Sequence, residues 1–221
     1  MSNVWGLVGS YVLIFLIIGI STILQKAKLI GDEGARKFIH IGVSNWWILA
    51  MYFFNDDNAV WFAMIVPFTF IILNYISYRT NLLKAMERGG KGNLGTVYFP
   101  ISLLILVALT FGVLENPFIG AVGILVMGYG DGLAAVIGKA YGKHKLAFGK
   151  SIEGSITMFI ASFIVVFLVS SFTQSVQVSL ILALGVSALA TIVELITPKG
   201  LDNLSVPLST SLIFYILLLI I

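Results

Sequence analysis

The residue best placed to do chemistry is an aspartate surrounded by glycines inside an apolar segment of membrane length. It is Asp131, in the sequence Met127-Gly128-Tyr129-Gly130-Asp131-Gly132. A carboxylate at the centre of a bilayer costs roughly 2.5 to 3.5 kcal/mol, so it normally faces a protein cavity and a partner rather than lipid. Glycines leave neighbouring backbone N–H groups accessible, and this combination suits a metal-bound phosphate group. Glycines also form packing seams between transmembrane helices, and Gly138-x-x-x-Gly142 fits that alternative.

A basic, glycine-containing stretch follows this aspartate. Backbone N–H groups, lysine ammonium groups and a hydroxyl are what a polyphosphate requires. The candidate nucleotide-binding residues are Gly130, Gly132, Gly138, Lys139, Lys145, Gly149, Lys150 and Ser151, with Asn203 from a later segment. The stretch is not a P-loop, because the glycine before Gly149-Lys150-Ser151 lies too far upstream. It can also be a flexible basic connection, with Ser151-Ile152-Glu153 simply beginning the next helix.

Other carboxylates lie near the ends of apolar segments. Glu194 closes one such segment, and Asp202-Asn203 comes just before the next. Carboxylate and amide oxygens are the ligands that Mg²⁺ prefers. The predicted metal ligands are therefore Asp131, Glu194 and Asp202, and the family resemblance described below adds Glu153. Asp202-Asn203 can equally be ordinary turn chemistry at the start of a helix.

Three side chains are candidates for direct roles in catalysis. They are Asp131, Lys150 and His40, the last of which enters an apolar segment at its basic end in Arg36-Lys37-x-x-His40. A histidine can act as a general base. At a membrane surface, however, a lone histidine is more often a structural hydrogen-bonding group.

The composition predicts the elements that must position these residues. Hydrophobic residues make up 59% of the 221-residue chain and charged residues 10%, with a mean hydropathy of +1.04. A soluble domain would carry about a quarter charged residues. The absence of cysteine excludes disulfides and thiolate metal sites. The prediction is an all-α, polytopic membrane helix bundle, a single integral membrane domain over residues 1–221, whose first helix is retained rather than cleaved. The about eight expected spans are Trp5–Leu24, Phe38–Phe54, Ala59–Tyr78, Val97–Leu114, Pro117–Gly138, Ser155–Phe172, Val176–Ile196 and Val206–Ile221.

Charge placement predicts the orientation of the bundle. All 13 basic residues fall in alternate connections, namely 25–37, 79–96, 138–154 and 197–205, whereas the other connections carry Asp56, Asp57 and Glu115. The positive-inside rule then places both termini outside and the four basic connections in the cytoplasm. We expect a multi-pass protein of the cell membrane with its active site on the cytoplasmic face, and no nucleic-acid partner. Residues 80–92 are expected to form a short interfacial helix.

Taken together, the segments resemble the polyprenol kinase family, which includes dolichol kinase, phytol kinase and the CTP-dependent diacylglycerol kinase. The resemblance covers most of 36–207 and rests on Arg36-Lys37-x-x-His40, Gly92–Pro100, Gly130–Gly138, Gly149–Ser155, Glu194 and Leu201-Asp202-Asn203. It implies a membrane lipid kinase that transfers the terminal phosphate of CTP, or another nucleoside triphosphate, to the hydroxyl of a membrane alcohol. That alcohol would be a polyprenol, a phytol-like isoprenoid or a diacylglycerol, and the cofactor a divalent cation such as Mg²⁺. The resemblance also assigns Asp131, Lys150, Ser151, Glu153, Asp202 and Asn203 to the nucleotide–metal site.

Two alternatives remain at this point. One is a lipid cytidylyltransferase resembling the related phosphatidate cytidylyltransferases, although their acidic signature is not matched after Asp131. The other is a non-catalytic transporter or scaffold. A transporter would be expected to place polar groups near the midplane, often within repeats, whereas here they gather toward one face.

Overall fold

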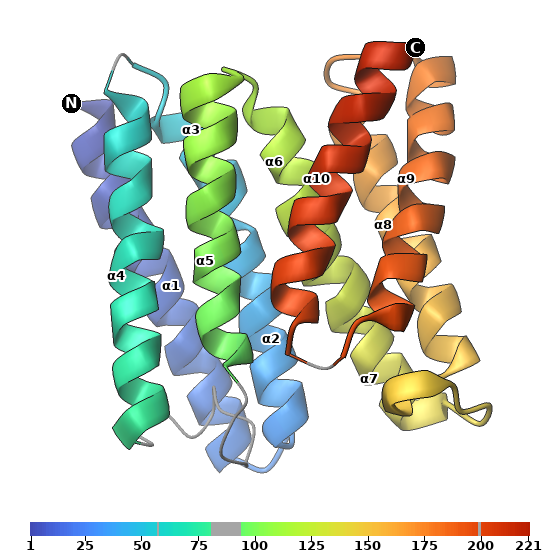
Figure 1. The fold of residues 1–221 in the computed structure, drawn as a ribbon. Coiled ribbons are helices and arrows are strands. Elements are labelled where there is room, and N and C mark those ends of the chain that lie inside the picture. The colour runs from blue at the N-terminus through green and yellow to red at the C-terminus, as the bar shows by residue number, and fades with distance from the viewer. Residues whose placement is uncertain (57, 81–93, 199) are drawn as a thin grey trace. The chain divides into compact units, whose positions relative to one another are not determined.

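The computed structural model describes residues 1–56, 58–80, 94–198 and 200–221, without the side chain of Ala147. Two compact units form, Met1–Pro117 and Phe118–Ile221 (Figure 1). The described residues of both units are organised as helices, with no strand longer than an isolated bridge. Nearly all of the interfacial helix expected over 80–92 lies outside the described residues. So do Asp57, Asn93 and Lys199.

The first unit begins with a helix and its antiparallel return. Ser21 Oγ of the first helix donates to the carbonyl of Ala35 at 2.9 Å, and Trp46 Nε1 donates to Ser10 Oγ at 2.7 Å. The chain therefore runs back alongside the first helix over the same depth. This second helical segment is interrupted at Asn45. The side-chain amide of Asn45 donates to the carbonyl of Ile41 at 2.8 Å and so occupies a backbone acceptor at the break. The elements are α1 (Ser2–Lys26), α2 (Asp32–Ser44) and α3 (Trp46–Phe53).

Two further helices complete the first unit: α4 (Ala59–Thr80) and α5 (Gly95–Val107), the latter continuing into the π-helical turn η1 (Ala108–Val113). Helix α4 runs in the same direction as α1, because Asn3 bonds to Asp56 at 2.5 Å and Tyr11 to Thr69 at 2.9 Å. The end of α1, the start of α2 and the end of α4 consequently lie at one end of this unit. The basic residues of this unit that the structure describes gather there: Lys26, Lys28, Arg36, Lys37 and Arg79.

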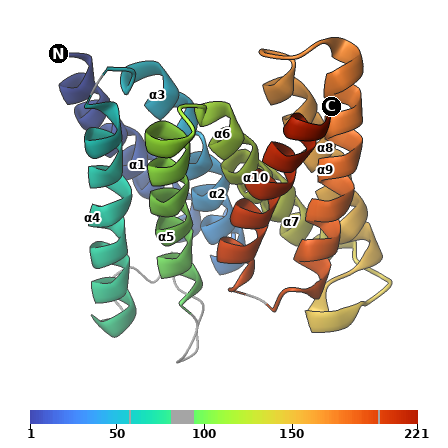
Figure 2. The ribbon, with the colours of Figure 1, turned by 45° about the horizontal axis from the view of Figure 1, so that its top comes forward.

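The second unit is built around a central rod of three consecutive elements. Its glycines allow close packing: a Cβ on Gly130 would lie 2.7 Å from Ser162 Oγ, and one on Gly138 would lie 3.5 Å from Gly154 Cα. These contacts pack the rod against α8 (Ile152–Ser170), the first helix that follows it. Gly123 packs against Pro207 of α10 (Asp202–Ile220), the last helix. Figure 2 shows the arrangement of α6 (Pro117–Leu125), η2 (Val126–Asp131), α7 (Gly132–Tyr141), α8 (Ile152–Ser170), α9 (Val176–Ile196) and α10 (Asp202–Ile220).

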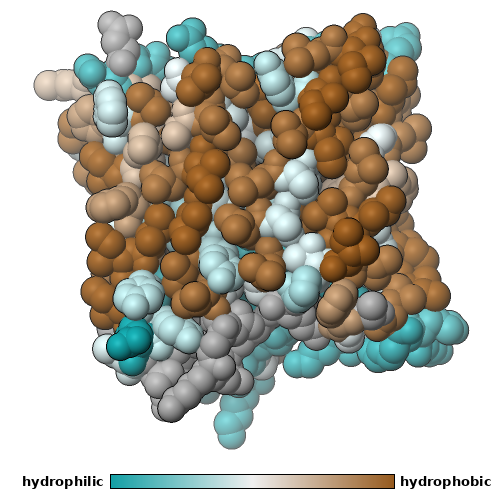
Figure 3. All heavy atoms as spheres, viewed as in Figure 1, coloured by the Kyte–Doolittle hydropathy of each residue, from teal (hydrophilic) through white to brown (hydrophobic). Residues whose placement is uncertain are grey.

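On the face seen in Figure 3, most of the exposed side chains over the helices are apolar. On α8 the exposed stripe recurs every four residues, at Ile156, Ile160, Ile164 and Leu168. Within the described residues, seven helical segments are long and apolar enough to cross a membrane. The second expected span, Phe38–Phe54, is not among them because the break at Asn45 leaves two short helices. The protein is a multi-pass, all-α membrane protein, as the composition predicts.

Candidate functional site

Asp131 lies at the junction of the π-helical turn η2 with α7 and is only 3% exposed. A π turn inserts an extra residue into the helix and is frequent at functional sites. The packing-seam interpretation accounts for Gly130 and Gly138, whose open sides are filled by α8. It gives no reason for a buried carboxylate between them.

The register between the rod and α10 places Asp131 at the depth of the turn that precedes α10. Ser211 Oγ donates to the carbonyl of Ile119 at 2.9 Å, and Gly123 faces Pro207. Each step of four residues along the rod thus moves four residues back along α10. Continued to the end of η2, this antiparallel register reaches the turn immediately before Asp202.

The basic stretch after α7 is a small hairpin rather than a loose connection. The N–H of Leu146 donates to the carbonyl of Lys150 at 2.8 Å, and that of Ile152 donates to the carbonyl of His144 at 3.0 Å. The tip turns through Gly149, whose φ of 72° is in the left-handed region that favours glycine. The hairpin therefore holds the backbone of Lys150 through its carbonyl.

Two of the predicted site residues have structural roles where the hairpin joins α8. Ser151 is the N-cap, and its Oγ accepts the N–H of Gly154 at 3.2 Å. Glu153 binds the imidazole Nδ1 of His144 at 2.9 Å. The structure agrees with the alternative interpretation of Ser151-Ile152-Glu153, that this segment begins the next helix. The assignment of Ser151 and Glu153 to a nucleotide–metal site stays a prediction.

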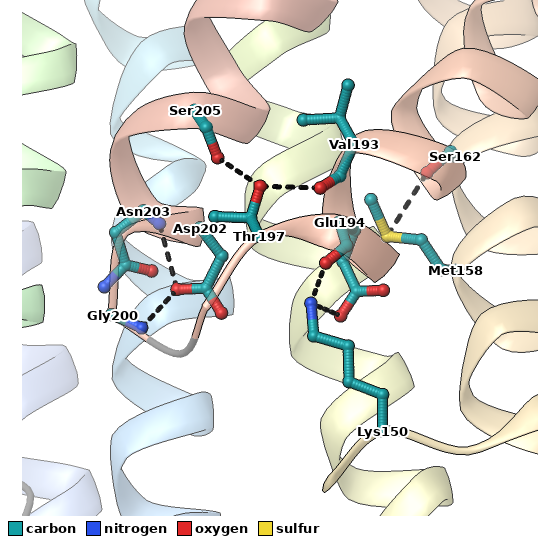
Figure 4. A network of polar contacts seen from close by, with 10 residues as sticks. All are labelled: Lys150, Met158, Ser162, Val193, Glu194, Thr197, Gly200, Asp202, Asn203 and Ser205. Carbon is teal, nitrogen blue, oxygen red and sulfur yellow. Dashed lines mark hydrogen bonds and ion pairs between the residues drawn. The ribbon is translucent and has the colours of Figure 1, made fainter. Parts of the chain in front are cut away.

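Lys150 ties the hairpin to the C-terminal end of α9 (Figure 4). Its ammonium group bonds to the backbone carbonyl of Glu194 and lies 2.6 Å from the Glu194 carboxylate. The two side chains are only 9% and 8% exposed, so water screens this ion pair weakly. Lys139 and Lys145, by contrast, are exposed to solvent.

The turn between α9 and α10 holds Asp202 by backbone hydrogen bonds. Its Oδ1 accepts the N–H of Gly200 at 2.9 Å and that of Asn203 at 3.0 Å (Figure 4). Gly200 has a φ of 101°, which is strained for any residue with a Cβ. Turn chemistry therefore accounts for one carboxylate oxygen of Asp202. Both Asp202 and Asn203 are buried.

These elements bring several charges together at one end of the second unit. The Glu194 carboxylate is attracted by Lys150 and lies within electrostatic range of Asp131 and Asp202, which repel it. We call Asp131, Lys150, Glu194 and Asp202 the charge cluster. Among the described residues, no three His, Cys, Asp or Glu side chains form a ready-made metal site. Mg²⁺ needs less from a protein that binds it with a nucleotide, since one or two carboxylates plus substrate phosphates suffice.

His40 belongs to the first unit and lines a pocket there. Its ring meets Phe99 edge-on at a centroid distance of 4.9 Å, and the side chain is 6% exposed. Asn74, from α4, lines the same pocket. The sequence indicates His40 as a candidate but does not indicate this pocket. The signal that could have indicated it is Asn74, an asparagine within an apolar helix.

Comparison with known proteins decides the family. The chain is 34% identical over 200 residues to a phytol kinase of Synechocystis sp., covering 86% of this chain and 82% of that one. It is 34% identical over 216 residues to a probable chloroplastic phytol kinase of Triticum aestivum, covering 88% and 70%. The chain belongs to the polyprenol kinase family. A dolichol kinase of Schizosaccharomyces pombe matches a shorter part, 36% identical over 88 residues, or 39% of this chain and 17% of that one.

Membership of the polyprenol kinase family confirms the resemblance carried by the sequence segments and supports a membrane lipid kinase. Kinase relatives imply a phosphoryl donor and a lipid alcohol acceptor. No family model matches the chain. No solved structure matches it either.

Proposed function

We propose that this member of the polyprenol kinase family transfers the terminal phosphate of CTP to a phytol-like isoprenoid alcohol. The observation that carries the proposal is the charge cluster, formed by segments that are far apart in sequence and buried at one end of the second unit. Similarity to phytol kinases over most of the chain supports the isoprenoid acceptor. The choice of CTP rests on the family resemblance of the sequence segments.

The reaction makes few covalent demands on the protein. The alcohol oxygen forms a bond to the terminal phosphorus, the bond from that phosphorus to the bridging oxygen breaks, and the nucleoside diphosphate leaves. Catalysis therefore consists of alignment and of neutralising charge on phosphate oxygens. Lys150 supplies the positive charge, and Glu194 holds its ammonium group in position. The exposed Lys139 and Lys145 draw the anionic nucleotide toward this end of the unit.

A divalent cation fits the donor atoms that the charge cluster and the adjacent Asn203 present. Asp131 and Asp202 offer hard carboxylate oxygens, and Asn203 offers an amide. Repulsion of Glu194 by both aspartates would fall when a cation binds. Bound there, the cation supplies charge neutralisation at the terminal phosphates. Asp131 serves as a metal ligand or as the acceptor of the hydroxyl proton, and both roles require its negative charge.

The basic ends of the helices are proposed to face the cytoplasm, with the protein in the cell membrane and both termini outside. The support is the positive-inside pattern of all 13 basic residues. The chain has no cysteine, so a single introduced cysteine reports accessibility without background. In intact cells, a membrane-impermeant maleimide should label Thr173→Cys and leave Gly149→Cys unlabelled. The reverse pattern would contradict this orientation.

The function is tested by incubating purified protein in detergent with Mg²⁺, each of the four nucleoside triphosphates and a panel of alcohols. The panel contains phytol, a long polyprenol and a diacylglycerol. We expect phosphorylated phytol to form fastest with CTP and to disappear when the metal is chelated. Diacylglycerol as the preferred acceptor, or activity that survives chelation, would overturn the corresponding part of the proposal.

A further inference from the structure

A pocket lies inside the first unit, among α1, α2, α4 and α5. It encloses about 620 Å³ of space not occupied by protein atoms, its open mouth included. The pocket is therefore continuous with the space outside it and is not a closed cavity. Most of the wall is aliphatic or aromatic: Ile14, Ile18, Val43, Val66, Phe70 and Leu103. Such a wall favours a hydrocarbon ligand.

One end of the pocket is polar. The wall there includes Arg36, His40, Asn74 and Thr96. The first three of these residues are each only 6% exposed. Asn74 donates its amide N–H to the carbonyl of Thr96 at 2.8 Å, which fixes the orientation of the amide group. The carbonyl oxygen of Asn74 and the imidazole of His40 are groups that bind an alcohol hydroxyl.

The length of the pocket follows from the helices that line it. From Arg36 to Trp46 is ten residues, or about 15 Å of helix, and from Val66 to Asn74 is eight, or about 12 Å. The polar end coincides with the basic end of the unit, where a lipid headgroup would lie. An apolar pocket with a polar end at headgroup level matches a hydrocarbon chain that carries one hydroxyl.

We propose that this pocket binds the hydroxyl end of the isoprenoid alcohol, with Asn74 and His40 contacting the hydroxyl and the first isoprene units along Val43, Phe70 and Leu103. The rest of a longer chain leaves through the open mouth into lipid. This inference rests on the proposed function. It assigns acceptor binding to the first unit, whereas the charge cluster for the donor belongs to the second.

A rival site exists in the second unit. It is a more open groove lined by Tyr129, Leu133, Thr157, Ile160 and Ile164. Ile160 and Ile164 belong to the exposed apolar stripe of α8, and among the groove's lining residues neither a charged side chain nor a buried amide occurs. Acyl chains of ordinary lipids satisfy such a surface, so it gives no reason to select an alcohol.

The test is photo-crosslinking with a diazirine analogue of phytol, carried out on the whole protein without nucleotide and mapped by mass spectrometry. We expect labels on α2, α4 and α5 at the pocket residues, and competition by phytol but not by the hydrocarbon lacking the hydroxyl. Labels confined to the groove beside Ile160, or equal competition by that hydrocarbon, would overturn the inference.

A pair of variants separates a filled pocket from a disturbed fold. Val43→Phe adds bulk inside the pocket and should reduce labelling there about tenfold or more. Ile65→Phe adds bulk on the same unit at a side chain that is 43% exposed and outside the pocket, so labelling should not change. Equal labelling of the two variants would contradict the assignment.

The outcome is independent of phosphoryl transfer, because no nucleotide is present. Labels in the groove together with normal phosphorylation of phytol would overturn the pocket assignment alone. Labels in the pocket without phosphorylation of any alcohol would overturn the proposed function alone.

Discussion

The ion pair between Lys150 and Glu194 gives the sharpest prediction about the second unit. Its two charged atoms are 2.6 Å apart and both side chains are more than nine-tenths buried. Removing one partner of a buried pair leaves an uncompensated charge and typically costs about 3 to 5 kcal/mol. An ordinary polar contact between membrane helices averages only about 0.6 kcal/mol. An unfolding measurement can distinguish a loss of about 3 to 5 kcal/mol from one of about 0.6 kcal/mol.

We therefore expect Lys150→Met to lower the free energy of unfolding by about 3 kcal/mol or more. Adding Glu194→Gln to it should restore most of that loss, because no unpaired charge remains. The assay is a double-mutant cycle of unfolding in mixed micelles, with Lys139→Met as a control at an exposed lysine. A coupling energy below about 1 kcal/mol would refute the burial and pairing described above.

The same double variant separates the structural role of Lys150 from its role with the nucleotide. Stability should return, but phosphorylation should not, since the cation that offsets phosphate charge is missing. A stable double variant with normal phosphorylation would show that Lys150 only fastens the hairpin to α9.

Three further predictions concern single residues. Asp131→Asn should lower phosphorylation about 100-fold or more without lowering the temperature of thermal unfolding, because it removes a charge that repels Glu194. Asp32→Asn, at an exposed residue of α2, should leave phosphorylation unchanged. An active Asp131→Asn protein would exclude both roles proposed for that carboxylate. Gly138→Leu should lower the free energy of unfolding by about 1 to 3 kcal/mol, because its Cβ would meet Ser151 Oγ at 3.0 Å. Gly19→Leu should be neutral, since a Cβ there has nothing within 4 Å. Equal stability of the two variants would contradict the packing seam. Gly200→Ala should lower the free energy of unfolding by about 1 to 2 kcal/mol, because Gly200 has a left-handed φ. The control is Gly31→Ala, at a glycine with an ordinary φ of −81°. Equal stability of the two variants would mean that the turn before Asp202 is not held as described.

The helices follow from the sequence where hydropathy and helix coincide. The predicted starts of α4 at Ala59 and of α9 at Val176 are those observed. Helix α10 instead begins at Asp202, four residues before the predicted Val206, because a helix can extend past the apolar core with polar residues in its first turn. Hydropathy marks the part of a helix in lipid, not its ends.

The break at Asn45 could not be predicted from the sequence, because the apolar residues continue on both sides of Asn45. It depends on whether an asparagine side chain takes a backbone carbonyl, and that is a local competition without a hydropathy signal. The ion pair between Lys150 and Glu194 could not be predicted from the sequence either, since 44 residues separate the two. Sequence alone indicated which polar residues were unusual, and the packing of helices determined which of them meet.

The chemistry assigned to the chain is tested most directly by the fate of the label from two forms of CTP. With Mg²⁺ and phytol, CTP labelled at its terminal phosphate should yield a labelled lipid and unlabelled CDP. CTP labelled at the phosphate next to the ribose should yield labelled CDP and an unlabelled lipid. Label from the second form in the lipid, with release of pyrophosphate, would identify a cytidylyltransferase and contradict the kinase.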